Sequence, residues 1–241
     1  MAKPAVTRAS VPRIAALDAL RGIAIVAMIV YHLCFDLRHF GVVRWDFEHD
    51  IRWLSARTAI LSSFLLIAGI SAVVARRNAA SDARWLRHVL RIGAAALLVT
   101  IGSMFVFPNS FIWFGVLHAI ALALLLARPL IDRPRAAFAI GAAIIVAGVT
   151  LASPQFDNRM LGWLGFMTGK PVTEDYVPLF PWSGVLLLGL AAGHWLAARD
   201  FAPLAPFSHL PRMLHFLGRH SLVVYLVHQP ILFGLLMLLV R

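Results

Sequence analysis

Residues 55–75 read SARTAILSSFLLIAGISAVVA, a run of small and apolar side chains with one charged residue, Arg57. An α-helix rises about 1.5 Å per residue, so a helix of this length spans roughly 30 Å, the thickness of the hydrocarbon core of a bilayer. Gly69 and Ser71 are small enough to allow close contact with another helix. The run therefore predicts a transmembrane helix that packs against a second one.

Similar apolar runs recur along the whole chain. Hydrophobic residues make up 61% of the 241 residues and charged residues only 14%, a composition that would leave a water-soluble domain without enough polar surface. We expect an all-α fold, a polytopic transmembrane helix bundle of about seven spans. The expected spans are residues 17–37, 55–75, 87–107, 110–130, 136–153, 179–198 and 219–240.

Positive charge is distributed unevenly between the expected loops. The chain carries 22 Lys and Arg against 11 Asp and Glu, and most of the basic residues lie in short links between apolar runs. Links of this kind are cytoplasmic by the positive-inside rule, so the basic excess indicates topology and no nucleic-acid partner. The basic segments are residues 1–16, 76–91, 128–135 and 199–219. With an odd number of spans, the amino terminus is expected in the cytoplasm and the carboxyl terminus outside.

A single domain is the simplest organisation of residues 1–241, because no internal repeat or linker divides them. Residues 1–16 lack the apolar core and cleavage site of a signal peptide and are expected to form a cytoplasmic tail. The single cysteine, Cys34, has no disulfide partner and no metal-ligand pattern around it, so no metal is expected. The loops at 38–54 and 154–178 are expected outside, where they could cover a site. The lipid bilayer is the expected surrounding, and a homodimer is left open.

Four ionisable side chains stand out inside the expected spans, where each costs roughly 2.5–3.5 kcal/mol on insertion scales and suggests a function. His32 and Asp36 lie four residues apart on one helix face, within hydrogen-bonding reach. A carboxylate there can orient the imidazole and favour its protonated form, which predicts a base and its partner. His118 and His228 are expected near mid-depth. Each can also be a hydrogen-bonded packing residue, and Asp36 can simply mark a helix end.

Basic side chains lie at the expected cytoplasmic rim as well. Arg21, Arg91 and Arg219 fall at or within the apolar boundary, and His220 follows directly. A guanidinium removed from water requires an anionic partner such as a carboxylate, a lipid headgroup or a ligand phosphate. Asp18 is expected to satisfy only one of the three arginines. The set is therefore a candidate binding site for a ligand that carries phosphate.

Several segments resemble the catalytic-domain family of heparan-alpha-glucosaminide N-acetyltransferase, and they occur in order along the chain. The segments are RIAALDALRGIAI (residues 13–25), YH (31–32), FDL (35–37), FGVLH (114–118), YVPLFPW (176–182), LGRHS (217–221) and YLVHQP (225–230). The opening LDALRG, with a histidine eleven residues after Arg21, is also similar to the wider transmembrane acyltransferases that modify sugars and cell-surface polymers. His32 corresponds to the histidine of that wider group.

This resemblance implies membrane helices around a central site and an acyl-CoA donor, with acetyl-CoA expected, that is taken from the cytoplasm. It also implies an acceptor amine or hydroxyl of a sugar or envelope polymer on the outer face. The bacterial members of the family suggest a location in the bacterial inner membrane. Under this interpretation, the phosphates of the donor bind Arg21, Arg91, Arg219 and His220.

The resemblance and the polar residues together lead to a mechanism. His32 would act as the general base on the acceptor, with Asp36 holding its ring. His118 or His228 would donate a hydrogen bond to the thioester oxyanion. Direct transfer and a covalent acyl-histidine both stay open. The alternative functions are a proton-coupled transporter, against which the lack of an inverted repeat counts, and a non-catalytic membrane scaffold.

Overall fold

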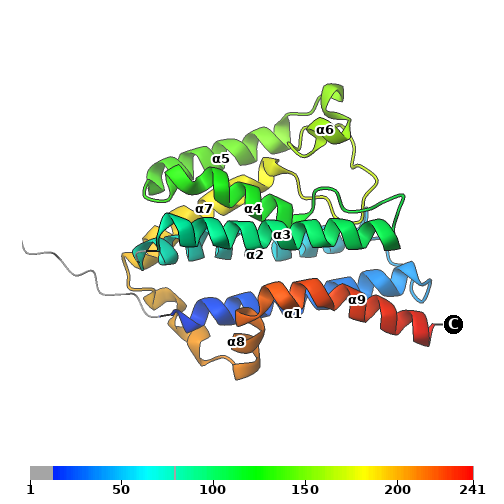
Figure 1. The fold of residues 1–241 in the computed structure, drawn as a ribbon, viewed down its shortest axis with the longest axis horizontal. Helices are drawn as coiled ribbons and strands as arrows, with labels where there is room; N and C mark the ends of the chain where they lie inside the picture. Colours follow the sequence, from blue (N-terminus) through cyan, green and yellow to red (C-terminus); the bar gives the residue numbers. More distant parts are fainter. Residues whose placement is uncertain (1–12, 79, 241) are drawn as a thin grey trace, which may run out of the picture.

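The protein is helical through most of the residues that the structure describes. A computed structural model describes residues 13–78 and 80–240, so most of the tail predicted at residues 1–16 lies outside the described residues. The α-helices are α1 (Ala15–His39), α2 (Ile51–Arg77), α3 (Asp82–Val106), α4 (Val116–Ala127), α5 (Pro134–Thr150), α6 (Arg159–Gly162), α7 (Leu179–Ala197), α8 (Arg212–Arg219) and α9 (Ser221–Leu239). Short 3-10 helices are η1 (Arg128–Leu130), η2 (Pro154–Phe156) and η3 (Ala202–His209). The long helices lie roughly along one axis, so the start of α1 and the end of α9 are at opposite ends of the bundle (Figure 1).

The described helices confirm the expected helical membrane fold, while the number of seven spans is not confirmed. Helices α1, α2, α3, α7 and α9 are long and apolar enough to cross a membrane. The apolar helices over Val116–Leu130 and Pro134–Thr150 are shorter. Helix α4 has 12 residues and rises only about 18 Å, too little to cross the hydrocarbon core alone.

Helix α4 begins later than the predicted span 110–130 because the preceding residues pair with another loop. The backbone N–H of Val177, just before α7, donates to the carbonyl of Phe114 at 3.1 Å. Phe114 also forms an isolated parallel β-bridge with Tyr176, so this stretch pairs with the loop before α7 and does not continue into the helix. The helix therefore starts only at Val116, after the bonded stretch.

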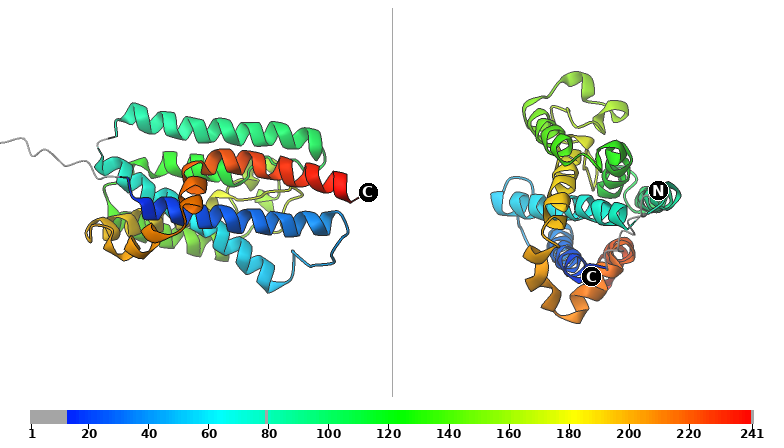
Figure 2. Two further views of the ribbon diagram at one scale, coloured as in Figure 1. Left: turned by 90° about the horizontal axis from the view of Figure 1, so that it is seen from below. Right: turned by 90° about the vertical axis from the view of Figure 1, so that its left-hand side faces the viewer.

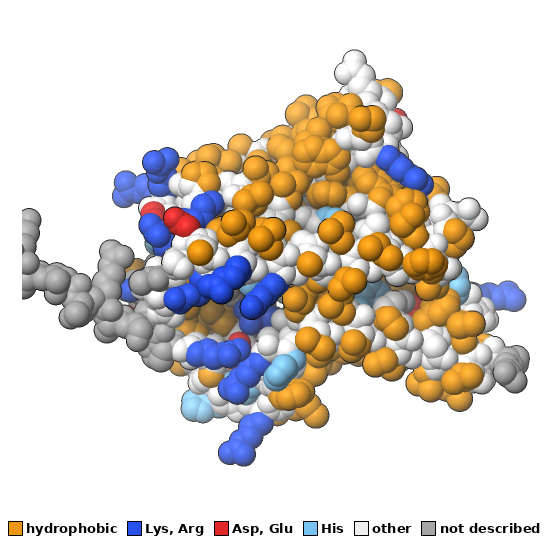
Figure 3. All heavy atoms as spheres, in the orientation of Figure 1, with side chains coloured by type: hydrophobic (Ala, Val, Ile, Leu, Met, Phe, Trp, Pro, Cys, Tyr) orange, Lys and Arg blue, Asp and Glu red, His pale blue; other side chains and the backbone are white. Residues whose placement is uncertain are grey.

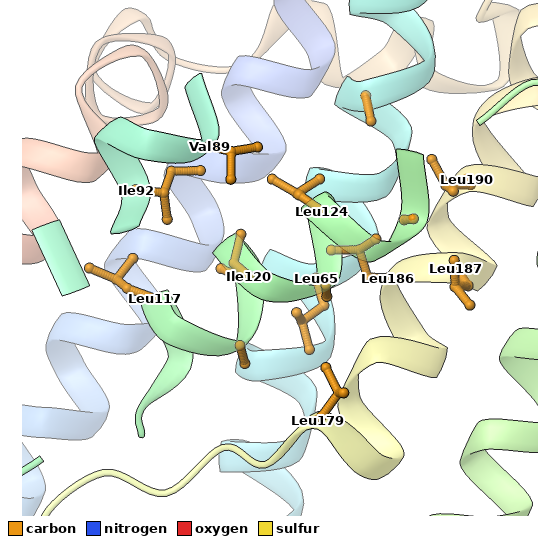
Figure 4. Close-up of a cluster of buried hydrophobic side chains, with 14 of the residues drawn as sticks. Leu65, Val89, Ile92, Leu117, Ile120, Leu124, Leu179, Leu186, Leu187 and Leu190 are labelled. Carbon is orange, nitrogen blue, oxygen red and sulfur yellow. The ribbon is translucent and has the colours of Figure 1, made fainter. Parts of the chain in front are cut away.

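Helices α2, α4 and α7 form the centre of the bundle. Leu65 of α2 meets Leu186 and Leu190 of α7 there, all three fully buried, and Ile120 and Leu124 of α4 join the same cluster (Figure 4). Lipid chains are as apolar as leucine, so close van der Waals packing, more than exclusion from water, holds such helices together.

Glycines allow the closest of these helix contacts. A side-chain carbon at Gly69 of α2 would overlap the backbone of α7 at Leu186, so only a hydrogen atom fits there. Gly22 of α1 and Gly218 of α8 each lie against the backbone of the other helix in the same way. The predicted close helix contact at Gly69 is therefore confirmed, and a second one fixes α8 to α1.

Apolar side chains cover much of the face drawn in Figure 3, and basic side chains gather toward one end of it. Phe105, Val149 and Leu98 are 84%, 70% and 62% exposed. An apolar surface of this kind is unusual for a water-soluble monomer and is expected where helices face lipid. Together with the long apolar helices, it indicates an integral membrane protein.

Helices α1 and α9 lie side by side and run in the same direction, although they come from opposite ends of the sequence (Figures 1 and 2). Helix α8 packs against α1, and the chain then turns at His220 to enter α9. This parallel arrangement places the polar residues of the first long helix next to those of the last.

Candidate active site

His32 of α1 and His228 of α9 are hydrogen bonded, with 2.9 Å between Nδ1 of His32 and Nε2 of His228. Nδ1 of His228 lies 2.6 Å from the carbonyl oxygen of Tyr225. A carbonyl oxygen can only accept, so Nδ1 of the neutral His228 carries the proton and Nε2 is its acceptor. His32 must then donate from Nδ1. This chain of bonds leaves the lone pair on Nε2 of His32 available as a base.

Aromatic side chains lie beside His32 on α1. Within the described residues, Nε2 of His32 has no hydrogen-bond partner. His228, which is bonded to the other ring nitrogen of His32, is buried, with 7% of its surface exposed. Tyr31 contacts both His32 and Phe47 edge-on, with ring centres 6.0 and 5.4 Å apart. Phe47 comes from the loop between α1 and α2 and is 3% exposed. That loop therefore covers the face of α1 beside the histidine.

Asp36 does not hold the ring of His32, contrary to the sequence-based expectation. Its Oδ1 instead accepts a hydrogen bond from Nε2 of Gln229 at 2.7 Å. The reason is that α9 runs parallel to α1. Its consecutive residues His228 and Gln229 therefore contact His32 and Asp36, which lie one helical turn apart on α1. Each polar residue of α1 therefore has its own partner on α9, and His228 takes the place that was expected for Asp36.

His118 of α4 is engaged by backbone and side-chain groups around the start of its own helix. Its Nδ1 accepts from the backbone N–H of Gly115 at 3.2 Å, so the proton of the neutral ring lies on Nε2. That nitrogen is 3.2 Å from Oγ1 of Thr100, whose hydroxyl donates to the carbonyl of Ile112 at 2.7 Å. Both ring nitrogens are used, which fits the packing role and leaves no N–H for a thioester oxyanion.

The loop before α7 is hydrogen bonded to the start of α4, close to His118. Oδ2 of Asp175 accepts from the backbone N–H of Val116, the first residue of α4, at 2.9 Å. Burial raises the pKa of the Asp175 carboxyl, while the bond from Val116 and the nearby charges of Arg57 and Lys170 lower it. An acidic cap of this kind stabilises a helix N-terminus. The loop before α7 and the start of α4 are thus held together.

Three arginines surround one buried carboxylate at the basic end of the bundle. Asp18 is 4% exposed, and its oxygens lie 2.7 Å from Nε of Arg13, 3.4 Å from Nη1 of Arg21 and 3.6 Å from Nε of Arg219. The expectation that Asp18 satisfies only one arginine is therefore wrong, because the contact of α8 with α1 brings Arg219 to the same carboxylate. Arg21 also donates to the Ser71 hydroxyl at 2.8 Å. One negative charge against three positive ones still leaves this end attractive to anions.

The other two predicted donor-binding residues differ from this cluster. Arg91 is exposed on α3, and it forms no ion pair with any residue that the structure describes. His220 lies at the junction of α8 and α9, where its Nδ1 is 2.9 Å from the carbonyl oxygen of Phe216. Arg91 is therefore free to bind an anion. The ring of His220 is instead bonded to a backbone carbonyl in the last turn of α8.

A comparison with known protein families identifies the chain. The family model described as Heparan-alpha-glucosaminide N-acetyltransferase, catalytic, matches residues 13–230. The chain belongs to this family. The searches of curated proteins and of solved structures returned no significant match. Membership of the heparan-alpha-glucosaminide N-acetyltransferase catalytic family identifies an acetyltransferase-like membrane protein.

The region matched by this family contains the residues that sequence analysis overlooked. Gln229 is a polar side chain within an apolar helix, directly after His228, and the cost of burying it is a signal that could have been noticed. The role of the Tyr225 carbonyl, by contrast, has no sequence signal, because every residue has a carbonyl. The participation of Arg13 and Ser71 around Asp18 and Arg21 also depends on contacts between distant segments.

Proposed function

We propose that the protein transfers an acetyl group from acetyl-CoA, taken from the cytoplasm, to an amine or hydroxyl of a sugar or envelope polymer on the outer face. The observation that carries this proposal is the bonding chain from Tyr225 through His228 to His32. It orients an imidazole and leaves one basic nitrogen without a partner in residues 13–78 and 80–240, which is what a general base requires. Membership of the acetyltransferase family supports the reaction class.

The basic end of the bundle suits the phosphates of the donor. Arg21 and Arg219 share Asp18 as a counterion, and Arg91 adds a further positive charge. Guanidinium groups bind phosphate strongly through paired hydrogen bonds. Arg21 and His32 are eleven residues apart on α1, a rise of about 16 Å, so an extended pantetheine arm along the helix would carry the thioester toward His32.

The chemistry that follows needs one base. Nε2 of His32 accepts the proton of the acceptor amine or hydroxyl as its nitrogen or oxygen attacks the carbonyl carbon of the thioester. The carbon–sulfur bond then breaks, and CoA leaves as a thiolate that takes the proton to become the thiol. His228 stabilises the imidazolium by accepting from Nδ1 of His32 throughout. Acetyl-CoA and the acceptor thus become CoA and the acetylated acceptor.

The test is an acetyl-transfer assay on purified protein in lipid nanodiscs. Labelled acetyl-CoA is supplied with a panel of amino sugars and neutral sugars, and labelled product is measured for the wild type, His32→Ala and His209→Ala. His209 is an exposed histidine of η3 and serves as the matched control. Transfer is expected in the wild type and in the control, and loss in His32→Ala. A folded wild type that binds no CoA would contradict the proposal.

A further inference from the structure

Asp36 and Gln229 leave two buried oxygen atoms without a partner among the residues that the structure describes. The Gln229 amide donates to Oδ1 of Asp36 at 2.7 Å. Oδ2 of Asp36 and Oε1 of Gln229 are both inaccessible and accept no hydrogen bond within the described chain. Asp36 as a whole is 1% exposed. Buried polar atoms are nearly always hydrogen bonded, so two acceptors left over in one pair of side chains require a missing donor.

A single proton would satisfy both oxygen atoms. A protonated carboxyl group has one O–H donor, and a primary amide has one carbonyl acceptor and one N–H donor. If Oδ2 of Asp36 carries the proton and donates to Oε1 of Gln229, the two side chains form a ring with two hydrogen bonds. The bond already present, from Nε2 of Gln229 to Oδ1 of Asp36, is the other half of that ring.

The charge balance around Asp36 agrees with a neutral acid. No Lys, Arg or His of the described residues forms an ion pair with Asp36, in contrast to Asp18, which has three cations around it. An ionised carboxylate at 1% exposure without a cation would carry the full cost of removing a charge from water. A metal ion is a poor substitute, because hard cations take six or more oxygen ligands and this pair offers two unpaired oxygens within the described part of the chain.

We propose that Asp36 is protonated in the resting protein and forms an acid–amide ring with Gln229, and that this ring is a positioning element for the His32–His228 pair. The proposal rests on the function proposed above for His32. The ring joins α1 to α9 one turn from the histidines and so sets the register of the two helices. A neutral Asp36 also leaves His32 unprotonated, since a carboxylate one turn away on the same helix face would favour the imidazolium.

The substitution Asp36→Asn tests the proposal directly. An asparagine amide can donate to Oε1 and accept from Nε2 of Gln229, so it reproduces both bonds without an acidic group. Turnover and melting temperature are expected to stay close to wild type, within about twofold for turnover, because no polar atom loses its partner. Asp36→Ala leaves the buried amide of Gln229 unpaired and is expected to lower turnover per folded molecule by about tenfold or more. Asp200→Asn, at an exposed position, is the matched control.

The pH profile separates a positioning role from a purely structural one. The titratable groups near this contact are His32 and His39 on α1 and His228 on α9. If Asp36 is neutral, Asp36→Asn leaves the acid limb of the turnover profile where it is in the wild type. If Asp36 is ionised, the same substitution removes a negative charge near His32, and the acid limb moves to lower pH. The second result would overturn the proposal.

Infrared spectroscopy gives a measurement that needs no substrate. The wild type at neutral pH is expected to show the C=O stretch of a protonated carboxyl group that is absent in Asp36→Asn and retained in Asp200→Asn. Absence of that band from the wild type would show an ionised Asp36 and contradict the ring. A melting temperature that rises with sodium in the wild type but not in Asp36→Asn would identify a bound cation and also contradict it. If the band is present but no acetyl transfer is found, the ring stands and the proposed function fails.

Discussion

Replacement of His228 tests whether the orientation of His32 depends on its neighbour. In the wild type, Nε2 of His228 accepts from Nδ1 of His32, and Nδ1 of His228 donates to the carbonyl of Tyr225. His228→Leu retains an apolar side chain at this 7% exposed position but removes the acceptor. The N–H of His32 then has no partner, and the ring is free to take the other tautomer.

The size of the effect follows from that lost bond. A buried donor without a partner costs about 1–3 kcal/mol. If the cost falls on the state in which His32 accepts a proton, turnover decreases about five- to 150-fold, since 1.4 kcal/mol corresponds to a factor of ten. His228→Gln keeps an amide oxygen within reach of His32, so its turnover is expected to stay within about tenfold of the wild type.

The assay measures acetyl transfer, CoA affinity and melting temperature on the same preparations of the wild type, His228→Leu and His228→Gln. Val227→Leu, at a neighbouring position of α9 that is 43% exposed, controls for a changed apolar side chain on this helix. CoA affinity is expected to be unchanged throughout, because the basic end is distant from His228. Full turnover in His228→Leu would refute the reasoning. So would equal losses in His228→Leu and His228→Gln that follow the folded fraction.

Other substitutions address the base, the donor site, the packing and the topology. His32→Ala is expected to lower acetyl transfer by about 10²–10⁴-fold, the usual contribution of a general base, with CoA affinity intact; an unchanged rate would place the base elsewhere. Arg21→Lys keeps the charge but loses the forked geometry, so CoA affinity measured by calorimetry should fall about tenfold, and unchanged affinity would remove Arg21 from the donor site. Gly69→Leu would overlap the backbone of α7 and should destabilise the protein by about 3 kcal/mol in a reversible unfolding assay, whereas a wild-type midpoint would contradict this contact. Reporter proteins fused to the two termini are expected on opposite sides of the membrane, and their appearance on one side would rule out an odd number of spans.

The helical membrane fold could be predicted from the sequence because hydropathy is a local property. The run at residues 55–75 contains its own evidence for a transmembrane helix, and α2 occupies that run in the structure. The role of Gly69 could be predicted as well, since a small residue in an apolar helix allows close packing against another helix. Helix α4 was harder to place. Its start depends on the bond between Phe114 and Val177, which are far apart in the sequence.

The polar residues of the site are also recognisable from the sequence, because each is expensive to bury in a membrane. Their partners are not. Helical periodicity correctly placed His32 and Asp36 on one face of α1, but it contains nothing about the helix that faces them. Because α9 packs parallel to α1, His228 is hydrogen bonded to His32, and Gln229 is hydrogen bonded to Asp36. Cost of burial is a property of one side chain, whereas a hydrogen bond between helices depends on their direction, rotation and register, which arise only when the bundle is assembled.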